Sequence, residues 1–412
     1  MSLLSKFTHL GISLAEKLDH FYATTFGKYT HTITNSPFQG RFTSPYQLLS
    51  KLSTGFCLTG RHSLSAHHSF QNAVIIGGTG TGKTSTVLLP SLFKMQGSFV
   101  VHDPSGELYH KSAGYLKAKG YTVKILNFSD ASRSDRYNPL ERATTASAIN
   151  KVAAMIVRTN LGTDGEAFWN LQAVNLISLM IHLVKASEVV DKSLAVVRIN
   201  LLYLSADPKK VEQKVNRLLP SDKVAEFQSF RGFDEKVKAG IIATCLSSLQ
   251  IFTDPEVSAI TREDSINLPS WRKQPTVLYI QNPTADQAYY ASLTALFFEQ
   301  MFGQVLRTLP KRGEENLFFL VDEAATLYIP SLAIVIANVR KYRCGLLLAL
   351  QDMAQLIERY GQADARTIVS NCFAKLYFTG QSLATATELE PERGFRGLVK
   401  NIIRDALLEV FY

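Results

Sequence analysis

The chain has 412 residues, a formal net charge of +9 at pH 7, and 46% apolar against 19% charged residues. It is longer than most single hydrophobic cores, so we expect two packed units with extensions in a soluble globular protein. No apolar run approaches the ~20 residues of a membrane-spanning helix, and no secretory signal is recognisable. The four cysteines lie far apart without a C-x-x-C spacing, which favours reduced thiols over disulfides. The basic excess indicates either a polyanionic partner or a solvated basic surface.

Residues 1–70 are predicted to form an N-terminal extension. Apolar residues recur near the start at spacings of three and four, which is typical of an amphipathic helix. Such a helix would pack on the main domain or, alternatively, dock on a membrane or a membrane partner. The residues that make this pattern are Leu3, Phe7, Leu10, Leu14, Leu18 and Phe21.

A glycine-rich loop follows the apolar run 73–76 and precedes a predicted helix. Gly77, Gly82, Lys83 and Thr84 meet the spacing G-x-x-x-x-G-K-[ST]. Glycines let backbone N–H groups converge on a β-phosphate, the lysine reaches the β and γ oxygens, and the threonine hydroxyl completes a Mg²⁺ shell. We therefore predict a site for ATP and Mg²⁺ made by Gly77, Gly78, Thr79, Gly80, Thr81, Gly82, Lys83, Thr84 and Ser85.

Strands and helices alternate around this loop. Apolar runs predict strands at 72–76, 98–102 and 122–127, with a helix at 107–118 between the last two, and Pro90 should end or bend the helix after the loop. This alternation predicts a parallel sheet with right-handed crossovers, so residues 71–143 are assigned to the first part of a nucleotide-binding domain. The sequence D-P-S-G at 103–106 also fits the magnesium-side motif of small GTPases, but no N-K-x-D guanine reader follows.

The strand pattern stops between residues 144 and 265. Helical stretches replace it, and the Asp-Pro pairs at 207–208 and 254–255 each read as an N-cap followed by proline at the first helical position. Residues 144–265 are therefore predicted to be an all-α domain inserted into the α/β domain.

The alternation then resumes in residues 266–384, the predicted second part of the nucleotide-binding domain. Buried strands are predicted at 276–281, 317–321, 345–350 and 374–379. Residues 385–412 are predicted to end the chain in an amphipathic helix that covers 393–412. The fold class is thus α/β, a P-loop NTPase with a mainly parallel sheet and an inserted all-α domain.

Polar residues follow two of these buried strands, at the end where open α/β sheets bind ligands. Asp322 is positioned to hold the Mg²⁺ shell and Glu323 to accept a proton from the attacking water, unless the pair merely caps a helix on the surface. Gln351 ends the next strand and is a candidate sensor of the γ-phosphate, or a solvent-facing glutamine. A metabolite kinase with the same phosphate loop would be shorter and would carry an acceptor lid.

Basic residues lie between these two strands, at Arg340, Lys341 and Arg343. One of them is a candidate arginine finger, which would stabilise charge on the γ-phosphate bound by a neighbouring subunit. The alternative is a solvated basic turn.

Besides the phosphate loop, an ordered series of segments is VVHDPSGEL at 100–108, YNPL at 137–140, AFW at 167–169, residues 240–261 with FTDP at 252–255, VDE at 321–323, LQDMAQL at 350–356 and YG at 360–361. This series resembles the type IV secretion coupling proteins, the conjugative DNA-transfer ATPases related to the FtsK pumps. The resemblance runs from about residue 60 to 384.

The resemblance implies a RecA-like domain that assembles as a homohexamer around a DNA channel. It implies that ATP hydrolysis moves relaxase-bound single-stranded DNA, or effector proteins, into a type IV secretion channel. By the same resemblance Lys83 and Thr84 bind phosphate and metal, Asp322 binds metal, Glu323 is the base, Gln351 the sensor and Arg340 the finger, although Arg343 competes for that role.

Three departures from the family pattern affect these expectations. Ser105 stands where the family usually has lysine, the family's amino-terminal membrane helices are not found, and the chain stops soon after the strand at 374–379. We therefore expect a cytoplasmic protein, associated with the cytoplasmic face of the bacterial inner membrane through a partner or a missing N-terminal anchor. The alternatives are a non-hydrolysing or truncated substrate receptor that binds ATP, and a double-stranded DNA translocase like FtsK or HerA.

Overall fold

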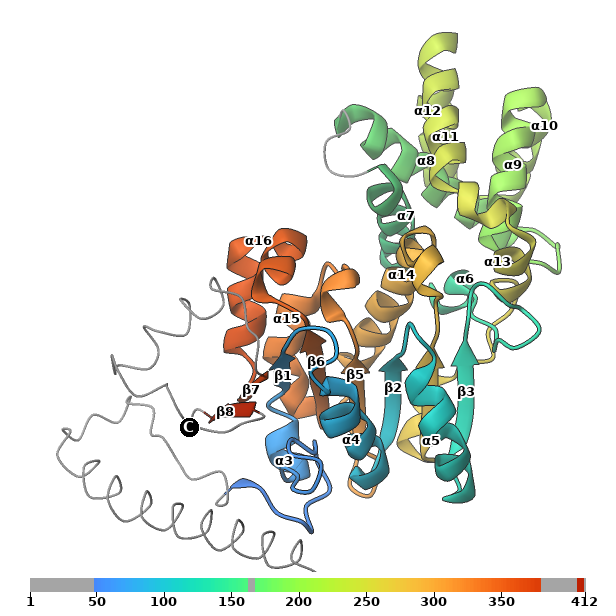
Figure 1. Cartoon of the computed structure of the whole chain (residues 1–412). Helices are drawn as coiled ribbons and strands as arrows, with labels where there is room; N and C mark the ends of the chain where they lie inside the picture. Colours follow the sequence, from blue (N-terminus) through green and yellow to red (C-terminus); the bar gives the residue numbers. More distant parts are fainter. Residues whose placement is uncertain (1–47, 162–166, 379–405, 411–412) are drawn as a thin grey trace, which may run out of the picture.

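The structure is a computed structural model that describes residues 48–161, 167–378 and 406–410. Its centre is an eight-stranded sheet in the order β3-β4-β2-β5-β6-β1-β7-β8, and all pairs are parallel except β7 with β8 (Figure 1). The seven predicted strands are confirmed, each within one residue at either end. The strands are β1 Ala73–Ile76, β2 Ser98–His102, β3 Thr122–Leu126, β4 Thr276–Ile280, β5 Leu317–Val321, β6 Cys344–Leu350, β7 Ala374–Phe378 and β8 Ala406–Val410.

Both faces of the sheet are buried, which is why the central strands read as continuous apolar runs. In β1 the residues alternate between the two faces, with Ala73 and Ile75 in one core and Val74 and Ile76 in the other. The first core is covered by α3 Ala66–Ser69, a π-helix at Thr84–Leu88, α4 Leu89–Lys94 and α5 Glu107–Ala118. The second is covered by α14 Gln287–Val305, α15 Leu332–Asn338 and α16 Met353–Ser370. Short 3-10 turns lie at Leu268–Arg272, Thr284–Asp286, Ala324–Thr326 and Val339–Tyr342.

The segment 48–70 packs against the sheet as part of the first core. Its apolar side chains, including Phe56 and Phe70, are buried, and both rings contact Phe318 of β5 at centroid distances of 5.5 and 5.8 Å. This part of the predicted extension therefore belongs to the α/β core. The predicted amphipathic helix near the start lies outside the described residues.

The connection from β3 to β4 carries the predicted all-α segment, beginning after α6 Pro139–Arg142. Asp207 and Asp254 cap their helices through side-chain oxygens, each with proline directly after the cap, as predicted. The helices pack closely, since a Cβ on Gly240 would lie 2.7 Å from the indole of Trp169. They are α7 Ala146–Leu161, α8 Ala167–Ala186, α9 Leu194–Ala206, α10 Pro208–Leu218, α11 Ser221–Arg231, α12 Glu235–Ser248, a 3-10 turn at Gln250–Thr253 and α13 Pro255–Ile260.

In the described part of the chain one helix, α8, is long and apolar enough by length and composition to cross a membrane. The sequence prediction found no such segment. Half of the apolar window of α8 is buried inside the structure, and the helix packs against α7, α9 and α12. Its hydropathy therefore fits the core helix of the inserted domain.

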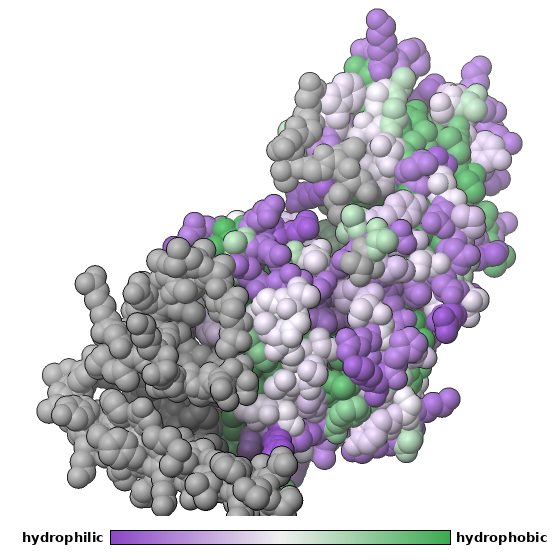
Figure 2. All heavy atoms as spheres, viewed as in Figure 1, coloured by the Kyte–Doolittle hydropathy of each residue, from purple (hydrophilic) through white to green (hydrophobic). Residues whose placement is uncertain are grey.

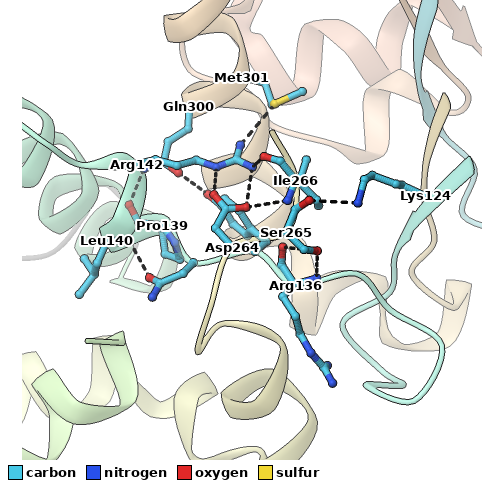
Figure 3. A network of polar contacts seen from close by, with 12 residues as sticks. Lys124, Arg136, Pro139, Leu140, Arg142, Asp264, Ser265, Ile266, Gln300 and Met301 are labelled. Atoms are coloured by element: carbon cyan, nitrogen blue, oxygen red, sulfur yellow. Dashed lines mark hydrogen bonds and ion pairs between the residues drawn. The ribbon is translucent and has the colours of Figure 1, made fainter. Parts of the chain in front are cut away.

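Two segments join the inserted helices to the sheet, and polar contacts fasten them together (Figure 3). Arg142, which precedes α7, forms a nearly buried ion pair with Asp264, which follows α13, with Nη2 3.0 Å from Oδ1. The same guanidinium lies over the rings of Tyr137 and Phe297, at 4.9 and 5.4 Å from their centroids. The junction between the two domains is thus built from both ends of the insertion and from α14.

The predicted C-terminal helix is wrong for residues 406–410. These residues form β8, which pairs antiparallel with β7 from Ala374↔Val410 to Phe378↔Ala406. Edge strands leave a row of unpaired backbone N–H and C=O groups, and β8 satisfies the free edge of β7. An apolar run of this length suits a strand as well as a helix, so tertiary pairing decides its structure.

The outer helices expose apolar side chains, which appear as a green group over α9 in Figure 2. Ile199 and Leu202 are 46% and 43% exposed, and Tyr203 beside them is half exposed. Lys210 and Lys214 of α10 lie over the Tyr203 ring at 5.8 and 6.0 Å. The described helices therefore leave an apolar face with a basic rim on the outside of the insertion.

Candidate active site

The loop at 77–84 directly follows β1, at the carboxyl edge of the sheet. Gly80 and Gly82 have φ values of 76° and 91°, which residues with a Cβ rarely adopt. At Gly77 the requirement is space, because a Cβ there would lie 2.6 Å from the Cβ of Phe378. The glycines of the motif therefore permit a tight backbone loop of the kind that cradles anions.

Lys83 is 8% exposed and folds back over this loop. Its Nζ donates to the carbonyl oxygens of Gly77 at 2.5 Å and Gly78 at 3.0 Å. Burial lowers the pKa of Lys83, and the nearby carboxylates of Asp322 and Glu323 oppose that change. The ammonium is placed where a phosphate oxygen would replace a carbonyl as its partner.

The other predicted phosphate-binding residues surround Lys83. Thr84 opens the π-helix that follows the loop, and π-turns are found often at functional sites. The Thr81 and Ser85 hydroxyls each donate to a carbonyl of the loop itself, at 2.8 and 3.2 Å. Thr79 is exposed at the tip of the loop.

Asp322 and Glu323 come directly after β5, which is separated from β1 only by β6. Burial and the charge of Glu323 raise the pKa of Asp322 to about 6, while Lys83 acts in the opposite direction. Glu323 has a left-handed backbone, with φ 54°, and its N–H donates to Asp322 Oδ1 at 3.1 Å. The lysine and both carboxylates thus share one edge of the sheet and act electrostatically on one another.

Gln351 follows the last residue of β6, as the sequence indicates. Its Nε2 donates to Oε1 of Glu323 at 3.2 Å. The predicted sensor therefore contacts the predicted base directly. A change in one of these side chains alters the hydrogen bonding of the other.

His102 supports this site and was not predicted, because a single histidine at the end of an apolar strand carries no sequence signal. It is fully buried at the end of β2, with Nδ1 2.9 Å from the carbonyl oxygen of Asp322. A carbonyl only accepts, so Nδ1 carries the proton and donates. Burial lowers the pKa of His102 to about 4, and the imidazole is therefore neutral near pH 7.

Asp103 and Ser105, in the D-P-S-G segment, have structural roles. The Asp103 carboxylate accepts from the backbone N–H groups of Leu108 at 3.2 Å and Tyr109 at 2.8 Å, at the start of α5. Ser105 Oγ accepts from the N–H of Glu107 at 3.3 Å. At the position where the resemblance places a lysine, the serine therefore accepts a hydrogen bond from a backbone N–H at the start of the helix.

A cleft of about 1410 Å³ opens beside Glu323 and Gln351. Its walls come from both domains, because Arg158 of α7, Asn170 of α8 and Gln287 of α14 all line it. The inserted helices and the carboxyl edge of the sheet therefore share one solvent-accessible space.

The structure places Arg340 away from the phosphate loop of its own chain. Arg340 precedes β6 and Lys83 follows β1. Because these two strands are parallel neighbours, the two residues lie at opposite ends of the strands. Its guanidinium lies 3.4 Å from Gln71 Oε1 and 3.3 Å from His67 Nε2. Arg343 has a left-handed backbone conformation, with φ 48°, and its Nη1 donates to the Lys311 carbonyl oxygen. Arg340 therefore has no role at its own phosphate loop.

The residues at this edge fit a magnesium nucleotide. Mg²⁺ prefers oxygen ligands, and the Thr84 hydroxyl after β1 and the Asp322 carboxylate after β5 would offer two of them. A Cβ on Gly80 would meet no atom within 4 Å, and the Lys83 ammonium would balance the charge of the phosphates. When bound, the metal would supply Lewis-acid stabilisation of charge on the phosphate oxygens.

A sequence profile of the family described as Type IV secretory system Conjugative DNA transfer matches residues 43–395. The chain belongs to this family. The predicted resemblance to coupling proteins is confirmed.

Individual relatives agree with this assignment. The chain is 24% identical over 337 residues to protein VirD4 of Agrobacterium fabrum, covering 78% of this chain and 48% of that protein. It is 25% identical over 309 residues to a probable conjugal transfer protein TraG of Sinorhizobium fredii, covering 71% and 47%. The chain thus spans about half the length of the curated relatives it matches.

The fold is similar to a solved structure of the plasmid coupling protein TrwB in complex with ADP and Mg²⁺. The TM-score is 0.64 at 18% identity, with 87% of this chain and 85% of that chain covered. The unbound form of TrwBdeltaN70 gives a TM-score of 0.66. The predicted RecA-like α/β class is confirmed by this likeness.

Proposed function

We propose that this chain is an ATPase that powers the transfer of DNA through a type IV secretion channel. The observation that carries the proposal is the meeting of Lys83, Asp322 and Glu323 at one edge of the sheet, in a member of the conjugative DNA-transfer family. The cargo proposed is single-stranded DNA bound to a relaxase, or an effector protein. The basic excess of the chain supports a polyanionic cargo.

Each residue of the site has a role in this proposal. The amides of the loop 77–84 and the Lys83 ammonium bind the phosphates of ATP, and Thr84 and Asp322 hold Mg²⁺. Glu323 accepts a proton from the attacking water, and Gln351 orients that water or responds to the γ-phosphate. The support for the last two roles is the hydrogen bond between the two side chains.

The proposed assembly is a homohexamer at the cytoplasmic face of the inner membrane, held there by channel components or by a membrane-anchor partner. In this assembly Arg340 would act on ATP bound by a neighbouring subunit, because this side chain does not reach the phosphate loop of its own chain. The matching family model is described as conjugative DNA transfer of the type IV secretory system, which supports the secretion channel as the partner.

ATP turnover measured with and without single-stranded DNA tests the proposal. Lys83→Ala should weaken nucleotide binding, because a charge-assisted phosphate contact is lost. Glu323→Gln should bind ATP as the wild type does and turn it over at least about a hundredfold more slowly, because the proton acceptor is removed. Wild-type turnover by Glu323→Gln would refute the assignment of the base.

A further inference from the structure

Glu323 has a backbone conformation that needs external support. Its φ of 54° places a non-glycine residue in the left-handed region, which is costly and is kept only when the surroundings hold it. Residues with such backbone conformations cluster at active sites. The residues that hold Glu323 therefore determine where its carboxylate points.

Thr326 supplies this support from the same 3-10 turn. Its backbone N–H and its Oγ1 both donate to the carbonyl oxygen of Glu323, at 2.9 and 2.8 Å. The hydroxyl has one proton, so its oxygen remains free to accept another hydrogen bond. Gln287 fills that position, with Nε2 2.6 Å from Thr326 Oγ1.

Gln287 connects this turn to the inserted domain. It is the first residue of α14, which packs against α7 between the sheet and the inserted helices (Figure 1). It also lines the same cleft as Arg158 and Asn170 of the inserted helices. A displacement of α14 would therefore act on Thr326 through this hydrogen bond.

We propose that Thr326 and Gln287 are positioning residues that hold Glu323 in its catalytic geometry and tie that geometry to α14. The inference rests on the proposed role of Glu323 as the base. Neither residue touches the phosphate loop in the described contacts, so both act through Glu323. Nothing in the sequence indicates this link, because 39 residues separate its two side chains.

The first test is Thr326→Val, which replaces the hydroxyl with a methyl of similar size. The expected result is a fall in kcat of about tenfold or more, with KM for ATP and the melting temperature nearly unchanged, because misplacement of a reacting group acts on the chemical step. Thr326→Ser keeps the hydroxyl and should restore most of the turnover. Wild-type kcat in Thr326→Val would overturn the proposal.

The second test uses Gln287→Met, which removes the donating amide at nearly constant length. The same substitution at Gln304, near the other end of α14, is the matched control and should leave kcat unchanged. Because Gln287 acts through Thr326, the double variant with Thr326→Val should be no slower than Thr326→Val alone. Additive losses would show that the two residues act separately, against the proposal. Gln287→Met alone still tests the proposal if Thr326→Val does not fold.

A third measurement separates this inference from the proposed function. In a Glu323→Gln background, Thr326→Val should cause no further loss of turnover, because its only catalytic effect passes through Glu323. A further loss equal to that in the wild type would overturn the positioning role. If Glu323→Gln hydrolyses ATP normally, the proposed assignment of Glu323 as the base fails, whereas normal turnover in Thr326→Val alone refutes only the positioning role.

Discussion

At the scale of single residues, His102 links the stability of the fold to pH. Burial lowers its pKa from 6.5 to about 4, so between these values the unfolded chain binds a proton that the folded chain does not. The contribution of His102 to the free energy of unfolding is then complete above pH 6.5 and decreases as the pH falls toward 4. The expected loss from this group at pH 5 is about 2 kcal/mol. Urea denaturation at pH 7 and pH 5 measures it.

His102→Gln provides the comparison, because an amide can donate to the Asp322 carbonyl but does not titrate. The difference in unfolding free energy between the two pH values should be about 2 kcal/mol smaller in this variant. An equal difference in both proteins would mean that other groups carry the pH dependence.

At the scale of elements, the ion pair of Arg142 with Asp264 holds the two ends of the insertion together. Both side chains are nearly buried, at 12% and 11% exposed. Arg142→Met should lower the free energy of unfolding by about 3 kcal/mol, because it leaves a buried carboxylate without its cation. Chemical denaturation measures this loss.

Arg136→Met is the matched control in the same junction. Its ion pair with Glu263 is longer, at 3.9 Å, and Glu263 is 72% exposed. Solvent screening should keep the loss below about 1 kcal/mol. Similar losses in the two variants would contradict the special role of the buried pair.

The elements that the sequence predicts best are those whose pattern is local. Strands such as β1, β5 and β6 are continuous apolar runs, and the caps at Asp207 and Asp254 are marked by the proline that follows each. Two features depend on distant contacts and were not predictable. The residues 48–70 join the core through rings that meet Phe318, and β8 is a strand because it pairs with β7.

The candidate site likewise contains residues that the sequence predicts and residues that it does not. The positions of Lys83, Asp322 and Glu323 follow from a motif and from strand ends, which the topology brings to one edge. The supports of the site were not predictable, because His102 reaches Asp322 from another strand and Gln287 reaches Thr326 from another helix. Such contacts depend on tertiary packing, and no local pattern encodes them.

At the scale of the whole molecule, Arg340 connects catalysis with assembly. It lies at the opposite end of the parallel strands from its own phosphate loop, so any contact with a γ-phosphate would be to ATP on a neighbouring subunit. Arg340→Ala should then leave the affinity for ATP nearly intact and lower turnover on the order of a thousandfold. Lys341→Ala, at the exposed neighbouring residue, is the control and should turn over normally.

Mixing variants distinguishes a finger that acts between subunits from an arginine that merely supports the fold. A ring that contains both Arg340→Ala and Lys83→Ala chains can pair an intact phosphate loop on the first with an intact arginine on the second. Turnover should therefore reappear in the mixture, and specific activity of the wild type should rise with protein concentration. DNA should raise it further, and added salt should reduce that stimulation steeply, because DNA binding releases counterions. Turnover that neither depends on concentration nor recovers on mixing would leave an ATPase that works as a single subunit.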